Sequence, residues 1–132
     1  MMTKVLTVTL AGFRYNIFTE NGRFAAAIPT SKRAMKAALR VQPDGKFLPA
    51  DPHEPTSRRL ILSCAFLSIA LEQSETVEQL VKAIGGMTEH CAICGALLTD
   101  SLSVARGVGP ECTKKVWAIG TTRRVVDQRL KG

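Results

Sequence analysis

Three cysteines in the C-terminal third of the chain constrain its fold more than any other feature. Cys91 and Cys94 form a Cys-x-x-Cys pair followed by Gly95, and Cys112 comes after 17 intervening residues. Two residues between cysteines allow a tight turn that directs both sulfurs at one ion, and glycine tolerates the left-handed backbone of such turns. The spacing therefore predicts that the three cysteines meet at one metal ion.

The residues before Cys112 indicate how the third cysteine reaches the other two. Gly107-Val108-Gly109-Pro110 supplies flexible backbone and then a proline suited to the first turn of a helix. We expect Cys112 in that first turn, where free backbone N–H groups and the helix dipole favour a thiolate. The helix is expected to continue through Lys115 and Trp117. A cysteine turn, a short hairpin and a helix-borne cysteine, in this order, predict a treble-clef-like zinc site.

The sequence does not determine which group is the fourth ligand of this site. A structural zinc ion is bound tetrahedrally by four ligands. His90 is the first choice, although its position next to Cys91 requires the backbone to curl. The alternatives are Asp100, His53, Cys64 or a water. The expected cofactor is one structural Zn²⁺, bound by Cys91, Cys94, Cys112 and His90.

Residues 90–113 resemble a short, uncharacterised zinc-binding domain found in many phage and bacterial proteins. The family pattern is Cys-x-x-Cys-Gly-x-x-Leu-Thr-Asp, then a serine, then Gly-x-Gly-Pro-x-Cys. Ala96 stands where the family usually has arginine, and Ser101 where proline is common, so a partner contact by that arginine is not carried over. The resemblance implies zinc binding and a phage or mobile-element origin, and it defines no activity. The matching positions are Cys91, Cys94, Gly95, Leu98, Thr99, Asp100, Ser103, Gly107, Gly109, Pro110 and Cys112.

Length and composition are those of a folded protein of one domain, or of one modest domain with a small metal-stabilised unit. The chain has 132 residues, of which 45% are hydrophobic and 22% charged. Its first residues lack the apolar run and cleavage site of a secretory signal, and the longest apolar stretch, 60–71, is too short to span a bilayer. We expect a cytoplasmic protein with no membrane partner, in the host cytoplasm if a phage encodes it; in that compartment clustered cysteines favour metal over disulfides.

The pattern of apolar residues predicts an α+β fold. Residues 4–28 alternate apolar and polar side chains around an Asn21-Gly22 hairpin signal, which predicts a small antiparallel three-stranded meander. Helices are expected to follow, and the one that carries the apolar run is hydrophobic nearly all round, which favours burial on several sides. The stretch 43–57, with four prolines, is predicted to be a loop.

These elements divide the chain into two predicted units. The first, residues 1–86, holds the strands and helices at about 31–41, 58–72 and 76–84, the last of which Gly85-Gly86 is expected to end. The second, residues 87–132, is the zinc-binding module with its C-terminal helices.

The net charge of +7 is unevenly distributed along the chain. Residues 1–60 carry ten basic against four acidic side chains (+6), 61–89 one against four (−3), and 90–132 seven against three (+4). Two basic regions around an acidic middle suit a nucleic acid or another polyanion. The expected nucleic-acid-binding residues follow the third cysteine and are Lys114, Lys115, Arg123, Arg124 and Arg129.

The leading hypothesis from sequence is a non-enzymatic, zinc-stabilised binding protein associated with nucleic acid. The alternative is a small phage-type protein that binds and inhibits or redirects a host protein, such as a polymerase or a defence complex. A zinc-dependent enzyme is third: Glu89 and Glu111 flank the cysteines as candidate bases, but the sequence has no deaminase signature, no His-Glu-x-x-His and no P-loop. Strong salt dependence of binding separates the first hypothesis from the second.

Overall fold

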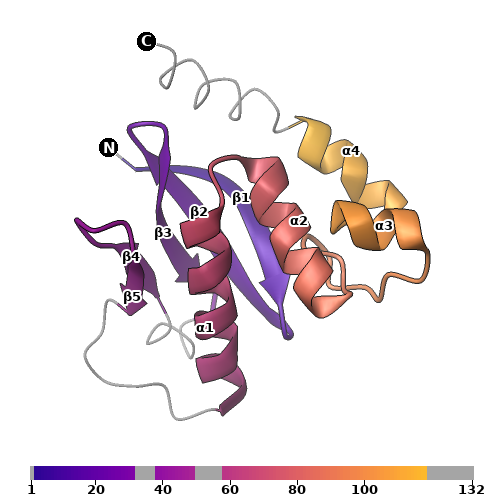
Figure 1. The fold of residues 1–132 in the computed structure, drawn as a ribbon, viewed down its shortest axis with the longest axis horizontal. Helices are drawn as coiled ribbons and strands as arrows, with labels where there is room; N and C mark the ends of the chain where they lie inside the picture. Colours follow the sequence, from indigo (N-terminus) through magenta and orange to yellow (C-terminus); the bar gives the residue numbers. More distant parts are fainter. Residues whose placement is uncertain (1, 32–37, 50–57, 119–132) are drawn as a thin grey trace.

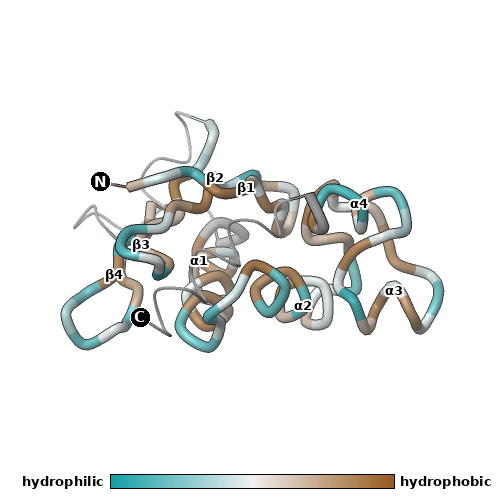
Figure 2. Tube along the Cα trace, turned by 90° about the horizontal axis from the view of Figure 1, so that it is seen from above, coloured by the Kyte–Doolittle hydropathy of each residue, from teal (hydrophilic) through white to brown (hydrophobic). Residues whose placement is uncertain are grey.

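A computed structural model describes residues 2–31, 38–49 and 58–118 of the chain. In this part the protein is α+β, with five antiparallel strands in sequence order and the helices α1 and α2 on one face of the sheet (Figure 1). Figure 2 shows the sheet as one layer and these helices as another, with α3 and α4 beyond α2 at one end. The elements are β1 (Thr3–Leu10), β2 (Phe13–Glu20), β3 (Arg23–Pro29), β4 (Leu39–Val41), β5 (Phe47–Pro49), α1 (Arg58–Gln73), α2 (Val77–Thr88), α3 (Ser101–Arg106) and α4 (Pro110–Ala118).

The stretch predicted to contain strands, residues 4–28, holds β1, β2 and β3. Alternate side chains of β1 and β2 are buried under the helices, among them Val8, Tyr15 and Ile17 at 0% exposure. Asn21-Gly22, with φ of 54° and 77°, connects β2 to β3 in the left-handed conformation that this dipeptide favours.

The predicted number of three strands is wrong, because β4 and β5 extend the sheet. β4 pairs with β3 (Ala27 opposite Leu39), and β5 pairs with β4 (Val41 opposite Phe47). β4 falls where the helix 31–41 was expected to end, and β5 falls in the predicted loop 43–57. The run Pro43-Asp44-Gly45 connects β4 to β5, with Gly45 at φ 86°. Residues 32–37 and 50–57 lie outside the described residues.

The two long helices begin close to the predicted positions. α1 spans the predicted 58–72 and one residue more. α2 begins after Thr76, whose hydroxyl oxygen accepts a hydrogen bond from the N–H of Gln79 at 3.2 Å. Its predicted end is wrong, because Gly85 and Gly86 remain helical and the chain leaves α2 at Glu89, with φ 57°.

One hydrophobic cluster joins the sheet, the helices and the cysteine segment. It contains Leu67 of α1 and Leu80 of α2 together with Cys91 and Cys112, so both predicted units contribute to it. The expectation that α1 is buried on several sides is wrong for the described part of the chain: α1 packs one face against the sheet and α2 and leaves Leu62 and Phe66 about half exposed. In the described part of the chain, no helix has the length and apolar character that crossing a membrane requires.

Candidate metal centre

The first two cysteines lie on a narrow loop that starts directly after α2. The N–H of Leu98 donates to the carbonyl of Glu89 at 2.9 Å, and the N–H of Cys91 donates to the carbonyl of Ala96 at 2.7 Å. The N–H of Gly95 donates back to the carbonyl of Cys91 at 2.8 Å. Gly95 has φ +82°, the left-handed conformation expected for a glycine after the second cysteine. We call this stretch, residues 90–97, the cysteine loop.

Strand β1 fixes the position of the cysteine loop. The N–H of Thr9 donates to the carbonyl of Ala92 at 2.7 Å, and the hydroxyl of Thr9 donates to the carbonyl of Ile93 at 2.7 Å. A Cβ atom on Gly95 would lie 2.9 Å from the Thr9 methyl carbon, closer than real Cβ contacts. The loop therefore rests on the sheet through its backbone, which holds its cysteines in place against β1.

The third cysteine reaches the loop through a short helix, α3, in the place of the expected hairpin. The Asp100 side chain caps α3, and Gly107 ends it with φ 78°. The carbonyl of Gly107 accepts a hydrogen bond from the N–H of Ala92 at 2.9 Å, which ties α3 to the cysteine loop. Pro110 then begins α4, so Cys112 stands in its first turn, as the sequence predicted.

The structure brings the three cysteines together. The Sγ atoms of Cys91, Cys94 and Cys112 all lie within 4.8 Å of one another. Cys91 and Cys112 are buried, whereas Cys94 is exposed. Sulfurs that share one tetrahedral Zn²⁺ at about 2.3 Å each are separated by roughly 3.8 Å. The donor set therefore fits one thiophilic ion with small side-chain adjustments, and the three residues could hold a metal.

The thiols influence one another's ionisation. Burial, followed by contacts with the sulfurs of Cys91 and Cys94, raises the pKa of Cys112 to about 12. Burial also opposes ionisation of Cys91, but hydrogen bonds from the backbone N–H groups of Cys94, Gly109 and Ile93 outweigh it and lower the pKa of Cys91 to about 7. A first thiolate thus makes the next one harder to form. A divalent cation removes this repulsion and favours all three thiolates at once.

The other proposed ligands do not join the cluster. His90 is not brought to the three sulfurs: its Nδ1 lies 2.8 Å from the carbonyl oxygen of Thr88. Neighbouring side chains on extended backbone point to opposite sides, so the ring turns away from the sulfur that follows it. Asp100 is occupied as the α3 cap, and Cys64 lies in the hydrophobic core. His53 lies outside the described residues. Within the described ranges, only the three cysteines make up the group.

Comparison with known proteins finds a family match for the segment that holds the three cysteines. Residues 82–116 match a family of unknown function (DUF6011). The match runs from within α2 to within α4, about a quarter of the chain, and supports a small uncharacterised domain there. Its start inside α2 has a physical reason, because Gly85 of α2 packs directly against the backbone of Gly107. No curated protein and no solved structure matches the chain.

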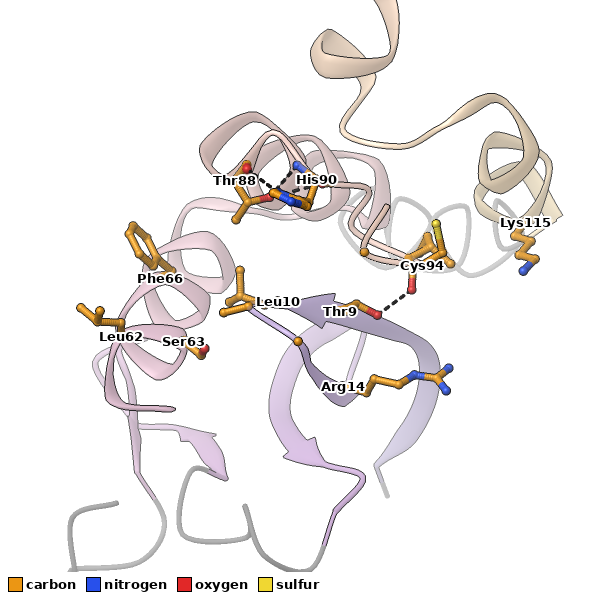
Figure 3. A pocket seen from close by; sticks show the side chains of 14 residues that line it. Thr9, Leu10, Arg14, Leu62, Ser63, Phe66, Thr88, His90, Cys94 and Lys115 are labelled. Atoms are coloured by element: carbon orange, nitrogen blue, oxygen red, sulfur yellow. Dashed lines mark hydrogen bonds between the residues drawn. The ribbon is translucent and has the colours of Figure 1, made fainter. Parts of the chain in front are cut away.

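A groove of about 940 Å³ opens beside Cys94. Figure 3 shows Arg14 of β2 and Lys115 of α4 on the same side of it as this cysteine, and Leu62 and Phe66 of α1 on the opposite side. Of the lining residues in the described part of the chain, none is Asp or Glu. We call this feature the cationic groove.

The sequence identified only one of the two cations in the groove as a binding residue. Lys115 was expected, and Lys114 next to it is exposed on the same helix. Arg123, Arg124 and Arg129 lie outside the described residues. Arg14 was not among the expected binding residues, although the β2 alternation places it opposite the buried Tyr15 and leaves it exposed.

Proposed function

We propose that the chain is a non-enzymatic binding protein in which one structural Zn²⁺ stabilises the cysteine segment and whose partner is nucleic acid. The observation that carries this proposal is the convergence of Cys91, Cys94 and Cys112 beside a groove. Cys94, Arg14 and Lys115 line this groove, and its described lining residues include no carboxylate. The resemblance to domains of phage and bacterial proteins supports a phage-type protein that acts in a host cytoplasm.

Three observations favour zinc in a structural role. Zinc binds a set of three thiolate ligands well, and few other metals available to a protein do so. Zinc also has no redox chemistry of its own. The cysteine turn and the cysteine in the first turn of a helix are two of the three parts of a treble-clef site, and α3 stands in place of its hairpin. Apolar packing around the site is incomplete: Leu98, Val108 and Val116 join the core, but Leu97 and Leu102 are 62% and 57% exposed, so ion binding adds to the folding free energy of this segment. A water, or a residue beyond those described, completes the four ligands.

The charge balance of the groove favours an anionic partner. Zn²⁺ with three thiolates carries a charge of −1, since −3 + 2 = −1. Arg14 and Lys115 at the groove and Lys114 beside it carry +3, and Glu111 on the same helix carries −1, so the local sum is −1 + 3 − 1 = +1 and remains positive. A phosphate backbone releases bound counterions when it meets such a cluster, and this gives sequence-independent affinity that falls with salt. We therefore propose that the groove contacts phosphates.

Replacing both Arg14 and Lys115 by alanine is expected to weaken oligonucleotide binding about tenfold at low salt. Removal of two phosphate contacts also flattens the log–log dependence of affinity on salt by between about 1 and 2 units. Fluorescence anisotropy with short single- and double-stranded oligonucleotides of mixed sequence, over a series of salt concentrations, measures both quantities.

Arg23→Ala is the matched control, because Arg23 is an exposed arginine of the same sheet that lies near Glu20 and Glu75 and away from the groove. It is expected to leave both affinity and slope nearly unchanged. Equal losses in the control and in the double variant would place the contact elsewhere. Absence of any binding below tens of micromolar at low salt would reject nucleic acid and favour the host-protein alternative.

A further inference from the structure

Helix α1 has two apolar faces, and among the described residues only one of them packs against other parts of the fold. Successive helix residues are separated by about 100° around the axis. The face toward the sheet is buried, and the residues that form it are Ser63, Cys64, Leu67, Ala70 and Leu71. The opposite arc, about 140° wide at this spacing, is exposed although no charged residue interrupts it between 60 and 71. We call it the outer α1 face: Ile61, Leu62, Ala65, Phe66 and Ile69.

The exposure of this face is unusual for a surface helix. Ile61, Leu62, Phe66 and Ile69 are 43%, 52%, 43% and 45% exposed. The neighbouring helix α2 follows the ordinary pattern, with polar residues such as Gln79 and Lys82 on its solvent side. When one surface helix carries a contiguous apolar stripe and its neighbour has a polar solvent side, the stripe marks a surface that another molecule covers.

We propose that a second copy of the chain covers the outer α1 face, with the two α1 helices packed antiparallel about a two-fold axis at Ala65. This axis pairs residues that lie equally far from position 65 on the two helices. Residue i of one copy therefore lies level with residue 130 − i of the other, since 2 × 65 = 130. Ile61 then faces Ile69 of the second copy and Ala65 faces its own counterpart. The small alanine at the crossing lets the helix axes approach to roughly 8–10 Å. A self-complementary surface of this kind is what two-fold dimers require.

The charges at the ends of α1 favour this antiparallel arrangement. In sequence the helix begins with Arg58 and Arg59 and ends with Glu72 and Gln73. The pairing of residue i with residue 130 − i brings the basic start of one helix next to the acidic end of the other, at both ends of the helix pair. The Glu72 carboxylate accepts a hydrogen bond from the N–H of Phe47 at 2.9 Å and remains exposed. A parallel pairing would bring like charges together at each end, which is unfavourable.

The area of the outer α1 face predicts a weak dimer. With roughly 200 Å² for a large apolar residue, four residues exposed by nearly half provide on the order of 700 Å² from two copies. Typical stable interfaces bury about 1,600 Å² in total, and smaller ones are transient. The dimer is therefore expected to form at micromolar concentrations in the absence of nucleic acid, since Leu62 and Phe66 of the outer α1 face also line the cationic groove.

Sedimentation equilibrium of the zinc-loaded full chain tests the proposal, from about 1 µM to about 200 µM to cover a weak interface. A reductant is included because the exposed Cys94 could otherwise cross-link two copies. The weight-average mass is expected to rise with concentration from 14.3 kDa toward twice that value. Ala65→Glu places a charge on the axis and is expected to keep the chain monomeric throughout.

Ala105→Glu is the matched control, because Ala105 is an exposed alanine on α3, away from the outer α1 face. It is expected to dimerise like the parent chain, and circular dichroism checks that both variants are folded. A second variant, Ile69→Lys, should also abolish the mass increase. A monomeric mass for the parent chain over the whole range overturns the proposal, whatever else covers the face. An unchanged dimer in a folded Ala65→Glu variant overturns it equally.

Discussion

Replacing Cys112 by serine is expected to release the metal and to unfold residues 90–116, while the sheet, α1 and the first turns of α2 remain folded. Serine oxygen is a poor zinc ligand, and with one of three thiolates gone the two remaining cysteines cannot retain the ion. Structural zinc contributes on the order of 10 kcal/mol to the folding of small zinc domains. Leu97 and Leu102 stay exposed, so the burial of a few residues such as Leu98, Val108 and Val116 is what remains to hold this segment without the ion.

Native mass spectrometry and hydrogen exchange measure this effect together. The parent chain should carry one zinc ion and lose it to a chelator, and the Cys112→Ser variant should carry none. In the variant, amide protection should disappear around Val116 and remain in β2, whose Ile17 is fully buried. Cys64→Ala is the matched control, because Cys64 is the fourth cysteine and lies in the core away from the other three, so that variant should keep one zinc. Unchanged protection of Val116 without metal would contradict a structural role.

The parts of the fold that the sequence predicted depend on short-range signals. Asn21-Gly22 requires a left-handed turn wherever it stands, and Thr76 with Gln79 forms a local helix cap. The cysteine cluster belongs to the same class, because Cys-x-x-Cys fixes a turn and Gly-Pro starts a helix just before Cys112. In each case the residues that determine the structure lie within a few positions of one another.

The parts that the sequence did not predict depend on distant contacts. β4 has three residues, and their helical pattern yields to pairing with β3, which buries Leu39 completely. Tertiary burial of this kind overrides local propensity. The cationic groove combines Arg14 with Lys115, and only the packing of α4 beside the β1–β2 turn brings them to one surface. Likewise, the direction of the His90 ring depends on the bridge to Leu97, which adjacency to Cys91 does not reveal.

Gly85 and Gly86 show the same distinction between local and tertiary information. As a dipeptide they indicate the end of a helix, yet α2 continues through both. A Cβ atom on Gly85 would overlap the Cα, C and O atoms of Gly107, which is the left-handed cap of α3. A Cβ atom on Gly86 would meet nothing within 4 Å. The first glycine is therefore required where α2 and α3 touch, whereas the second stands on the open side of α2.

Gly85→Ala is accordingly expected to lower the free energy of unfolding by about 3 kcal/mol or more, because the clash is with backbone that no rotamer change relieves. α3 cannot retreat without breaking the hydrogen bond between Ala92 and Gly107, so the variant should also bind zinc less tightly. Gly86→Ala adds the same methyl group one residue later and should stabilise the protein by up to about 1 kcal/mol, since alanine is the better helix former. Urea denaturation of the zinc-loaded proteins compares the two. Similar urea midpoints for the two variants would contradict a close contact between Gly85 of α2 and Gly107 at the end of α3.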